Sequence, residues 1–145
     1  MDRRILVPID GSSQSWAALE HAATNFEGER IVALHVVDPV EGVYTGSEGG
    51  FYDPGAYDRA VERGEELCED ARERLEGFDA AESTSFETEV VTGRPAPAII
   101  EYAEENDVDH IVMGSHGRSG VSRILLGSIA ETVMRRATVP VTVVR

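Results

Sequence analysis

The sequence predicts an α/β fold in which one five-stranded parallel sheet carries helices on both of its faces. Three observations lead to this class. Short runs that are almost wholly apolar are typical of strands buried on both faces of a sheet. These runs alternate with stretches whose apolar residues recur at helical spacing, and glycine, proline and serine separate the two kinds of segment. The alternation indicates a doubly wound sheet, because each crossover helix covers one of the two faces.

Five strands and four helices are expected along the chain. The strands are expected at Arg4–Ile9, Ile31–Val37, Ser85–Val90, Ile111–Met113 and Val139–Arg145. The helices are expected from the N-cap Ser13 to Asn25, from Asp53-Pro54 or Tyr57 to Leu75, from Ala98 to Glu105, and from Gly127-Ser128 onward. The third strand alternates apolar and polar residues, so it is placed near an edge of the sheet.

One connection is longer than most loops of compact domains. Asp38–Ala56 is rich in glycine, tyrosine and proline, and its length predicts either a functional lid or a mobile insertion. The helix after it has apolar residues on one side and acids on the other. Gly64 interrupts that helix, at a modest cost in helix propensity.

The size and composition fit one domain that spans residues 1–145. The hydrophobic fraction of 41% is ordinary for a globular protein. No apolar run approaches the roughly 18 residues of a membrane span, and the first residues lack the pattern of a signal peptide. Cys68 is the single cysteine, which excludes an intrachain disulfide. The expected compartment is the cytoplasm.

The charge balance is strongly acidic. Thirteen basic residues, all of them arginine, stand against 27 acidic ones and give a net charge of −14. This balance argues against nucleic acid and against an anionic membrane surface as partners. The lysine-free, acidic composition also resembles that of proteins from salt-loving organisms, where high ionic strength screens like charges. An acidic protein from an ordinary source is the alternative that the composition leaves open.

The most informative stretch runs from Ile111 to Ile129. A buried strand is followed by Gly114 and Gly117, and Gly127-Ser128 then open a helix. A glycine-rich turn between a strand and a helix N-terminus is an arrangement in which backbone N–H groups converge on an anion. The chain has no lysine, so the stretch is not a P-loop, and the spacing does not match the Rossmann fingerprint. We interpret the stretch as a phosphate cradle.

The pattern Gly114-x2-Gly117-x9-Gly127-Ser128 resembles the ATP-binding motif of the universal stress protein family, with every fixed position filled. Ile5–Asp10, Ala33–Asp38 and Val139–Val144 are also similar to that family, so the resemblance covers essentially the whole chain. It implies an ATP-binding module with the strand order 3-2-1-4-5. It also implies Mg²⁺ held mainly by the nucleotide phosphates, since magnesium needs few protein carboxylates.

The candidate binding residues follow from the motif and from this resemblance. The motif contributes Gly114, Gly117, Gly127, Ser128 and the adjacent Ile129. Asp10, at the tip of the first strand, is expected to bind ribose hydroxyls or a nucleotide-bound metal. The resemblance implies that the backbone near Ile9 and Val36 contacts the adenine edge, with Pro8 and Met113 beside it. His116 and Arg118 lie within the loop, and Arg118 is expected to offset phosphate charge.

Most of these residues also have a purely structural interpretation, which for Pro8, Ile9, Val36 and Met113 is core packing. Gly114 and Gly117 are compatible with a tight turn, and Ser128 with Glu131 fits a capping box. Asp10 fits an Asx-turn. No residue is assigned as catalytic or as a metal ligand, and His116 is interpreted as a loop residue more readily than as a general base.

Three functions are compatible with the sequence: an ATP-binding regulatory module with slow or no hydrolysis, an ATP-hydrolysing or nucleotidyl-transferring enzyme, and a nucleotide-free interaction module. The intact motif favours the first. A homodimer through Val139–Val144 is expected, because this strand is apolar on both faces and falls at a sheet edge. Further protein partners remain unidentified.

Overall fold

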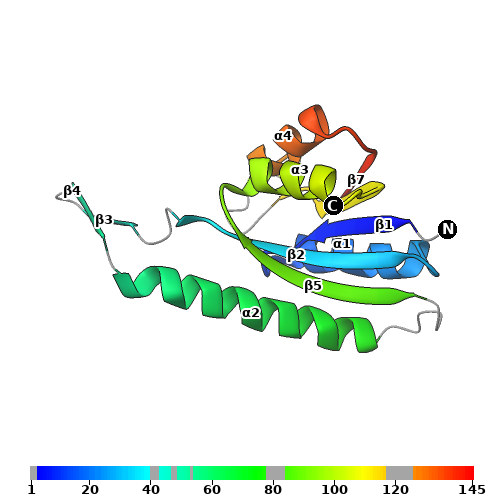
Figure 1. Ribbon diagram of the computed structural model, residues 1–145, viewed down its shortest axis with the longest axis horizontal. Helices are drawn as coiled ribbons and strands as arrows, with labels where there is room; N and C mark the ends of the chain where they lie inside the picture. Colours follow the sequence, from blue (N-terminus) through cyan, green and yellow to red (C-terminus); the bar gives the residue numbers. More distant parts are fainter. Residues whose placement is uncertain (1–2, 40–42, 47–48, 53, 78–83, 117–125) are drawn as a thin grey trace.

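The structure is a computed structural model that describes residues 3–39, 43–46, 49–52, 54–77, 84–116 and 126–145. A five-stranded sheet lies between two layers of helices (Figure 1). Its strands are β1 (Arg4–Pro8), β2 (Arg30–Val37), β5 (Ser85–Thr92), β6 (His110–Gly114) and β7 (Val141–Val144). All neighbouring strands pair in parallel, in the order β5-β2-β1-β6-β7. This order confirms the predicted fold class and topology.

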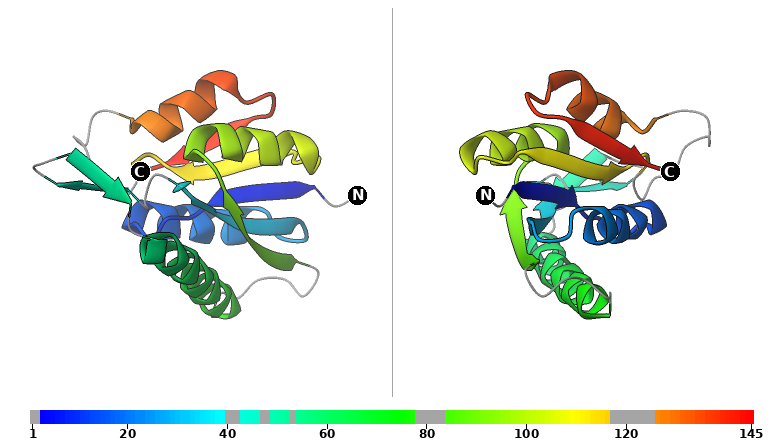
Figure 2. Two further views of the ribbon diagram at one scale, coloured as in Figure 1. Left: turned by 60° about the vertical axis from the view of Figure 1, so that its left-hand side comes forward. Right: turned by 90° about the vertical axis from the view of Figure 1, so that its right-hand side faces the viewer.

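Helices cover both faces of the sheet (Figure 2). The helices α1 (Ser13–Asn25) and α2 (Pro54–Glu76) bury one face, where Ile5, Val7 and Leu19 are fully inaccessible to solvent. On the other face, α3 (Pro95–Glu105) and α4 (Ser128–Arg136) pack on Leu6, Leu34 and Ile111. The apolar runs of the central strands therefore have partners on both sides, as buried parallel strands require. In the described part of the chain, no helix is long and apolar enough to cross a membrane.

Several of the predicted boundaries are wrong by a few residues. The N-cap of α1 is Ser12 rather than Ser13, and its hydroxyl accepts the Ser15 N–H at 3.2 Å. The helix α3 begins at Pro95, three residues before the expected start, because a proline fits the first turn of a helix. The last strand is shorter than expected, and Pro140 precedes it.

The long connection after β2 contains a second, two-stranded sheet that the sequence did not predict. β3 (Val43–Gly46) and β4 (Gly49–Tyr52) pair antiparallel, with Val43 opposite Tyr52. Strands of four residues that contain glycine give too short an apolar pattern to be recognised in a sequence.

Gly64 has a packing role in α2 that helix propensity does not reveal. A Cβ atom at this position would lie 2.7 Å from Cδ2 of His35 on β2. The His35 side chain has little room to move, because the residue is only 6% exposed and its Nδ1 lies 2.9 Å from the carbonyl oxygen of Ile9. The glycine therefore lets α2 approach the sheet closely at this histidine.

We expect Gly64→Ala to destabilise the protein by about 1 kcal/mol, although helix propensity alone favours alanine by about that amount. The added methyl group overlaps the His35 ring, and overpacking typically costs about 1–3 kcal/mol. Denaturant unfolding measures the difference. In a His35→Ala background the same substitution should stabilise the fold, because the clash is removed. A stabilising effect in the native background would contradict this packing argument.

Candidate functional site

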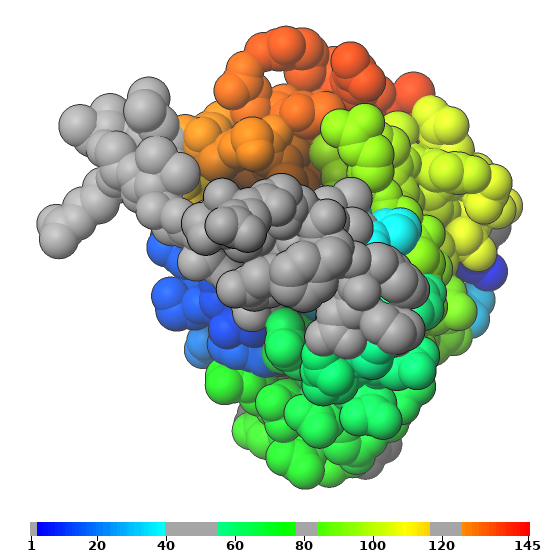
Figure 3. All heavy atoms as spheres, turned by 90° about the vertical axis from the view of Figure 1, so that its left-hand side faces the viewer, coloured from blue at the N-terminus to red at the C-terminus, as the bar shows by residue number. Residues whose placement is uncertain are grey.

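The candidate site lies at the carboxyl ends of the strands, where the sheet order reverses between β1 and β6. In doubly wound folds, ligands bind at this position. Figure 3 looks onto this end of the molecule, with α4 (orange) on one side and α1 (blue) on the other. The ends of β1, β2 and β6 and the N-termini of α1 and α4 all face it, so most of the described candidate residues lie in one region.

At the end of β1, the chain makes a tight turn into α1. Ile9 continues the pairing with β2, since its N–H donates to the Leu34 carbonyl at 2.8 Å. Asp10 is half-buried, and its Oδ1 accepts the Ser12 N–H at 2.9 Å, which is the predicted Asx-turn. Gly11 has a φ of +87°, a left-handed conformation that favours glycine. The turn thereby fixes the Asp10 carboxyl group at the reversal point of the sheet.

Gly114 ends β6, and its lack of a side chain serves the packing of α1. A Cβ atom here would lie 2.7 Å from Cβ and 2.8 Å from the carbonyl carbon of Gln14. Its φ is not in the left-handed region. The sequence suggested a glycine here so that a phosphate can approach the backbone. The structure adds a second reason, because α1 begins in direct contact with the end of β6.

Ser115 joins three elements of the site, and the sequence analysis did not single it out. Its N–H donates to the Val144 carbonyl at the end of β7 at 2.8 Å, and its carbonyl accepts the Gly127 N–H at 2.7 Å. The residue is only 4% exposed. These bonds bring the start of α4 back beside the end of β6. The two halves of the glycine motif are thus held together across the loop that separates them in sequence.

Among the described residues, no side chain caps the N-terminus of α4. Gly127 is the N-cap with φ −66° and ψ 157°, and the Glu131 N–H makes the first intrahelical bond to its carbonyl at 2.9 Å. The predicted capping box is wrong, because Ser128 is already the first helical residue and the Glu131 carboxylate pairs with Arg135. The N–H groups of Ser128, Ile129 and Ala130 have no intrahelical acceptors.

This arrangement suits an anion. Ser128 and Ile129 are exposed, so a ligand has access to the first turn of α4. The helix dipole and the N–H groups without intrahelical acceptors together favour negative charge there. Gly127 needs no special backbone conformation, since its dihedral angles are open to any residue.

His116 brings a buried nitrogen to the same region. The residue is 8% exposed, its Nδ1 lies 3.1 Å from the Ser115 hydroxyl, and its Nε2 is buried without a hydrogen-bond partner in the described structure. A buried polar atom left unpaired is costly, and such atoms often belong to ligand sites. The two remaining loop candidates, Gly117 and Arg118, lie outside the described residues. Among the described residues, no cluster of histidine, cysteine or carboxylate side chains has the arrangement of a metal site.

The residues expected near adenine are largely engaged within the protein. Both backbone groups of Ile9 are hydrogen-bonded, the N–H to Leu34 and the carbonyl to the His35 ring. Met113 is only 4% exposed and belongs to the core beneath α3 and α4. Val36 packs against that core. Pro8 ends β1 and is half-buried. His35 therefore holds the Ile9 carbonyl in place, a role that the sequence pattern did not indicate.

Comparison with known proteins places the chain in a family. The model of the universal stress protein family matches residues 1–145, so this protein belongs to that family. The universal stress protein MJ0531 of Methanocaldococcus jannaschii is 36% identical over 146 residues, covering 99% of this chain and 82% of that protein. MJ0577 of the same organism, another universal stress protein, is 32% identical over 155 residues, covering 100% of this chain and 96% of its own length.

Solved structures agree with this assignment. The structure of MJ0577 superimposes with a TM-score of 0.81 at 31% identity, covering 99% of this chain and 96% of that one. The universal stress protein UspA from Lactobacillus plantarum gives a TM-score of 0.80 at 27% identity, with coverage of 99% and 97%. The predicted family resemblance and the Rossmann-like sheet are confirmed.

The two described motif glycines are expected to differ in their effect on stability. Gly114→Ala should destabilise the fold by about 2 kcal/mol or more, because the new methyl group meets the Gln14 backbone, which cannot rotate away. Gly127→Ala should cost less than about 1 kcal/mol, the range of a helix N-cap exchange. Denaturant unfolding of both variants measures the contrast. Equal stabilities would contradict the packing role of Gly114.

Proposed function

We propose that this universal stress protein binds an adenine nucleotide, ATP above all, at the carboxyl end of the sheet between β1 and β6. The observation that carries the proposal is the exposed N-terminus of α4, which no side chain of the described residues caps and which the Ser115 carbonyl group holds beside the reversal point of the sheet. Helix N-termini in this position bind phosphate groups in many α/β proteins.

The residues of the site fit such a ligand. The first-turn N–H groups of α4 would bind the phosphates, and the orphaned Nε2 of His116 offers a further polar contact in the same region. Asp10 would bind the ribose hydroxyls. The adenine ring would lie near Ile9, Val36 and Met113. From the motif, Gly117 and Arg118 are proposed to contact phosphate as well, with Mg²⁺ held mainly by the phosphates.

Universal stress proteins of the same fold have been solved with adenine nucleotides. One was solved in complex with cAMP, one from Arabidopsis thaliana with AMP bound, and one from Archaeoglobus fulgidus with dAMP. These proteins are 16–24% identical to this chain, a similarity that establishes the fold alone. They are consistent with the proposal, which itself rests on the residues of this chain.

We propose a regulatory role in the cytoplasm, in which binding rather than turnover matters. The loop histidine, His116, has Nδ1 against the Ser115 hydroxyl, and in this proposal its Nε2 contacts the nucleotide, so neither ring nitrogen is left to act as a general base. A general base must reach a water molecule or a hydroxyl group of the substrate. Hydrolysis is therefore proposed to be slow or absent. An ATP-hydrolysing enzyme is the alternative, and continuous release of ADP over many turnovers would favour it.

Ser128→Pro is expected to weaken ATP binding about tenfold or more. The substitution removes one N–H from the phosphate cradle, and a hydrogen bond to a charged group contributes roughly 1.5–3 kcal/mol. Proline is well tolerated at the first position of a helix, and the extended Gly127 is compatible with a following proline. Isothermal titration with ATP and magnesium measures the affinity.

Ser128→Ala is the matched control, because it removes the hydroxyl group and keeps the N–H. It should lose less affinity than Ser128→Pro. Unchanged ATP affinity in a stably folded Ser128→Pro protein would remove α4 from the proposed site. Chromatography of the nucleotide after each titration separates binding from hydrolysis.

We also propose a homodimer through β7. This strand is a sheet edge, and its four residues are all half-buried. Pro140 and Val144 direct their carbonyl groups at β6. Because alternate residues of a strand direct their backbone groups to opposite sides, Val141 and Val143 direct theirs outward. A second copy of β7 can pair with them across a two-fold axis.

Val143→Pro is expected to give a monomer while the fold persists. Proline removes an outward N–H that would pair with the second copy, and none of the hydrogen bonds between β7 and β6. Light scattering over a range of protein concentrations measures the mass. Val143→Ala, which keeps the N–H, should remain dimeric. A native protein that is monomeric at all concentrations would overturn the dimer.

A further inference from the structure

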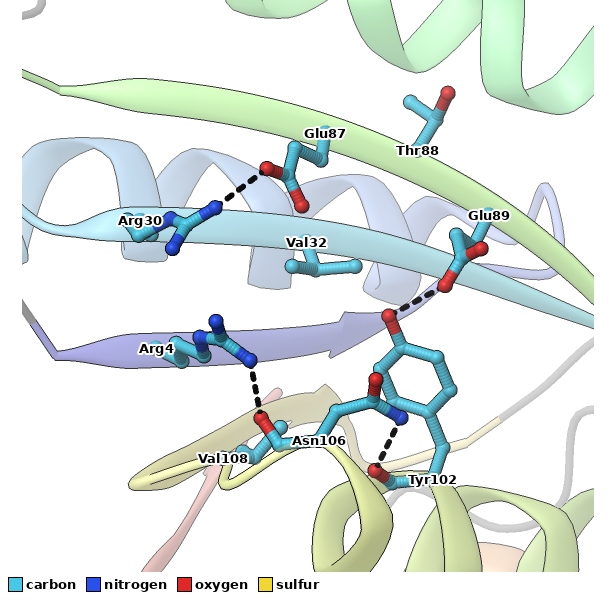
Figure 4. A pocket seen from close by; sticks show the side chains of 9 residues that line it. All are labelled: Arg4, Arg30, Val32, Glu87, Thr88, Glu89, Tyr102, Asn106 and Val108. Atoms are coloured by element: carbon cyan, nitrogen blue, oxygen red, sulfur yellow. Dashed lines mark hydrogen bonds and ion pairs between the residues drawn. The ribbon is translucent and has the colours of Figure 1, made fainter.

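A cavity lies on the α3 side of the sheet, away from the carboxyl ends of the strands (Figure 4). Its volume is about 320 Å³, which is at the lower end of the range for small-molecule sites. Val32 of β2 lines it and is only 4% exposed. Residues of β1, β2 and β5 lie on one side, and the end of α3 lies on the other. Val108 also lines the cavity, and the other lining side chains are polar or charged.

The sheet register arranges these charges in two groups. Arg4 on β1 and Arg30 on β2 are direct neighbours, so both guanidinium groups emerge at the amino ends of the strands. Glu87 and Glu89 follow along the edge strand β5, opposite Val32 and Leu34. They are two residues apart, and their side chains therefore lie on the same face. The cavity thus has a cationic end, and its acidic groups extend along one side.

Arg4 is the least compensated charge at the cationic end. Arg30 pairs with Glu87 at 2.9 Å, whereas no carboxylate of the described chain lies within 4 Å of the Arg4 guanidinium. Its Nη1 donates to the Asn106 carbonyl at 2.7 Å. The nearby Asp109 carboxylate accepts the backbone N–H of Arg4. In a protein with 27 acidic residues, an arginine beside a second arginine in a cavity and without a carboxylate partner points to an external anion.

Tyr102 holds Glu89, the acidic group of the cavity that lies farther from the arginines, in place. Its hydroxyl donates to Glu89 Oε2 at 2.6 Å. Burial, together with the adjacent Glu89 carboxylate, raises the pKa of Tyr102, so the phenol keeps its proton and remains a donor. This bond uses one oxygen of Glu89. The carboxylate retains acceptor capacity for a second donor, because an ionised carboxyl group offers about four lone-pair sites.

We propose that this cavity binds a small zwitterion, with a carboxylate on Arg4, an apolar middle over Val32 and an ammonium group on Glu89. The two arginines and two glutamates carry no net charge together, so a ligand with separated charges of both signs matches them best. A plain anion would leave Glu89 unmatched, and a plain cation would leave Arg4 unmatched. The molecule belongs to the class of short amino acids, and it would bind independently of any nucleotide.

The experiment uses ω-amino acids of increasing length, from glycine through 4-aminobutanoate to 6-aminohexanoate, added to ¹⁵N-labelled protein. Amide chemical shifts around Val32 and Glu89 report binding, and butanoate and butylamine are the singly charged analogues. We expect at least one ω-amino acid to bind about tenfold more tightly than either analogue. Arg4→Gln should weaken that binding about tenfold or more, and Arg135→Gln on α4, outside the cavity, should leave it unchanged.

Glu89→Gln is the sharper variant, because the amide oxygen still accepts the Tyr102 hydroxyl and the fold should be kept. It should weaken the ω-amino acid about tenfold and leave butanoate binding unaffected. Arg4→Lys, which keeps the charge, covers the case in which Arg4→Gln fails to fold. Two results would overturn the proposal: no shifts with any member of the series, or equal affinities for butanoate and the ω-amino acids. Neither result bears on ATP binding, which α4 variants test separately.

Discussion

The two backbone hydrogen bonds of Ser115 hold the carboxyl end of this sheet together. The N–H fixes the end of β7, and the carbonyl fixes the start of α4. Because the residue is buried, water does not compete for either group. The position of α4 and the position of the edge strand β7 therefore both depend on the backbone of one residue. Nucleotide binding and self-association, as proposed for this chain, would act on structural elements that share this junction.

Close packing between helices and sheet explains residues whose roles look different in sequence. Gly114 lets α1 approach the end of β6, and Gly64 lets α2 approach His35 on β2. The His35 ring in turn is hydrogen-bonded to the Ile9 carbonyl. At each position a side chain would clash with the neighbouring element, and its absence lets the two elements touch. Because protein interiors are densely packed, a shift of one element would displace its neighbours. The geometry of the site at the end of β1 thus depends on a helix that contributes no predicted site residue.

The two ends of the strands carry positive potential from different sources. A net charge of −14 repels anionic ligands, so a protein that is proposed to bind polyanions needs local positive potential at the binding site. At the N-terminus of α4, backbone dipoles supply positive potential without any side-chain charge. At the opposite end of the strands, Arg4 and Arg30 supply it directly, and Glu87 and Glu89 balance them. The proposed nucleotide site and the cavity beside Arg4 are therefore suited to different classes of ligand.

The amino-acid pattern was enough to predict the parallel sheet, because continuous apolar strands are local patterns that tertiary context does not erase. The family, and with it the strand order, was predicted from the resemblance that the long spaced motif carries. The sequence also located Asp10, Gly127 and Ser128 at the end of the sheet where ligands bind. The folded arrangement was needed to show that Ser128 follows the cap, that Gly114 packs on Gln14 and that Ser115 joins β7 to α4. Hydrogen bonds and steric contacts between residues distant in the chain decide such roles, and no spacing along the sequence encodes them.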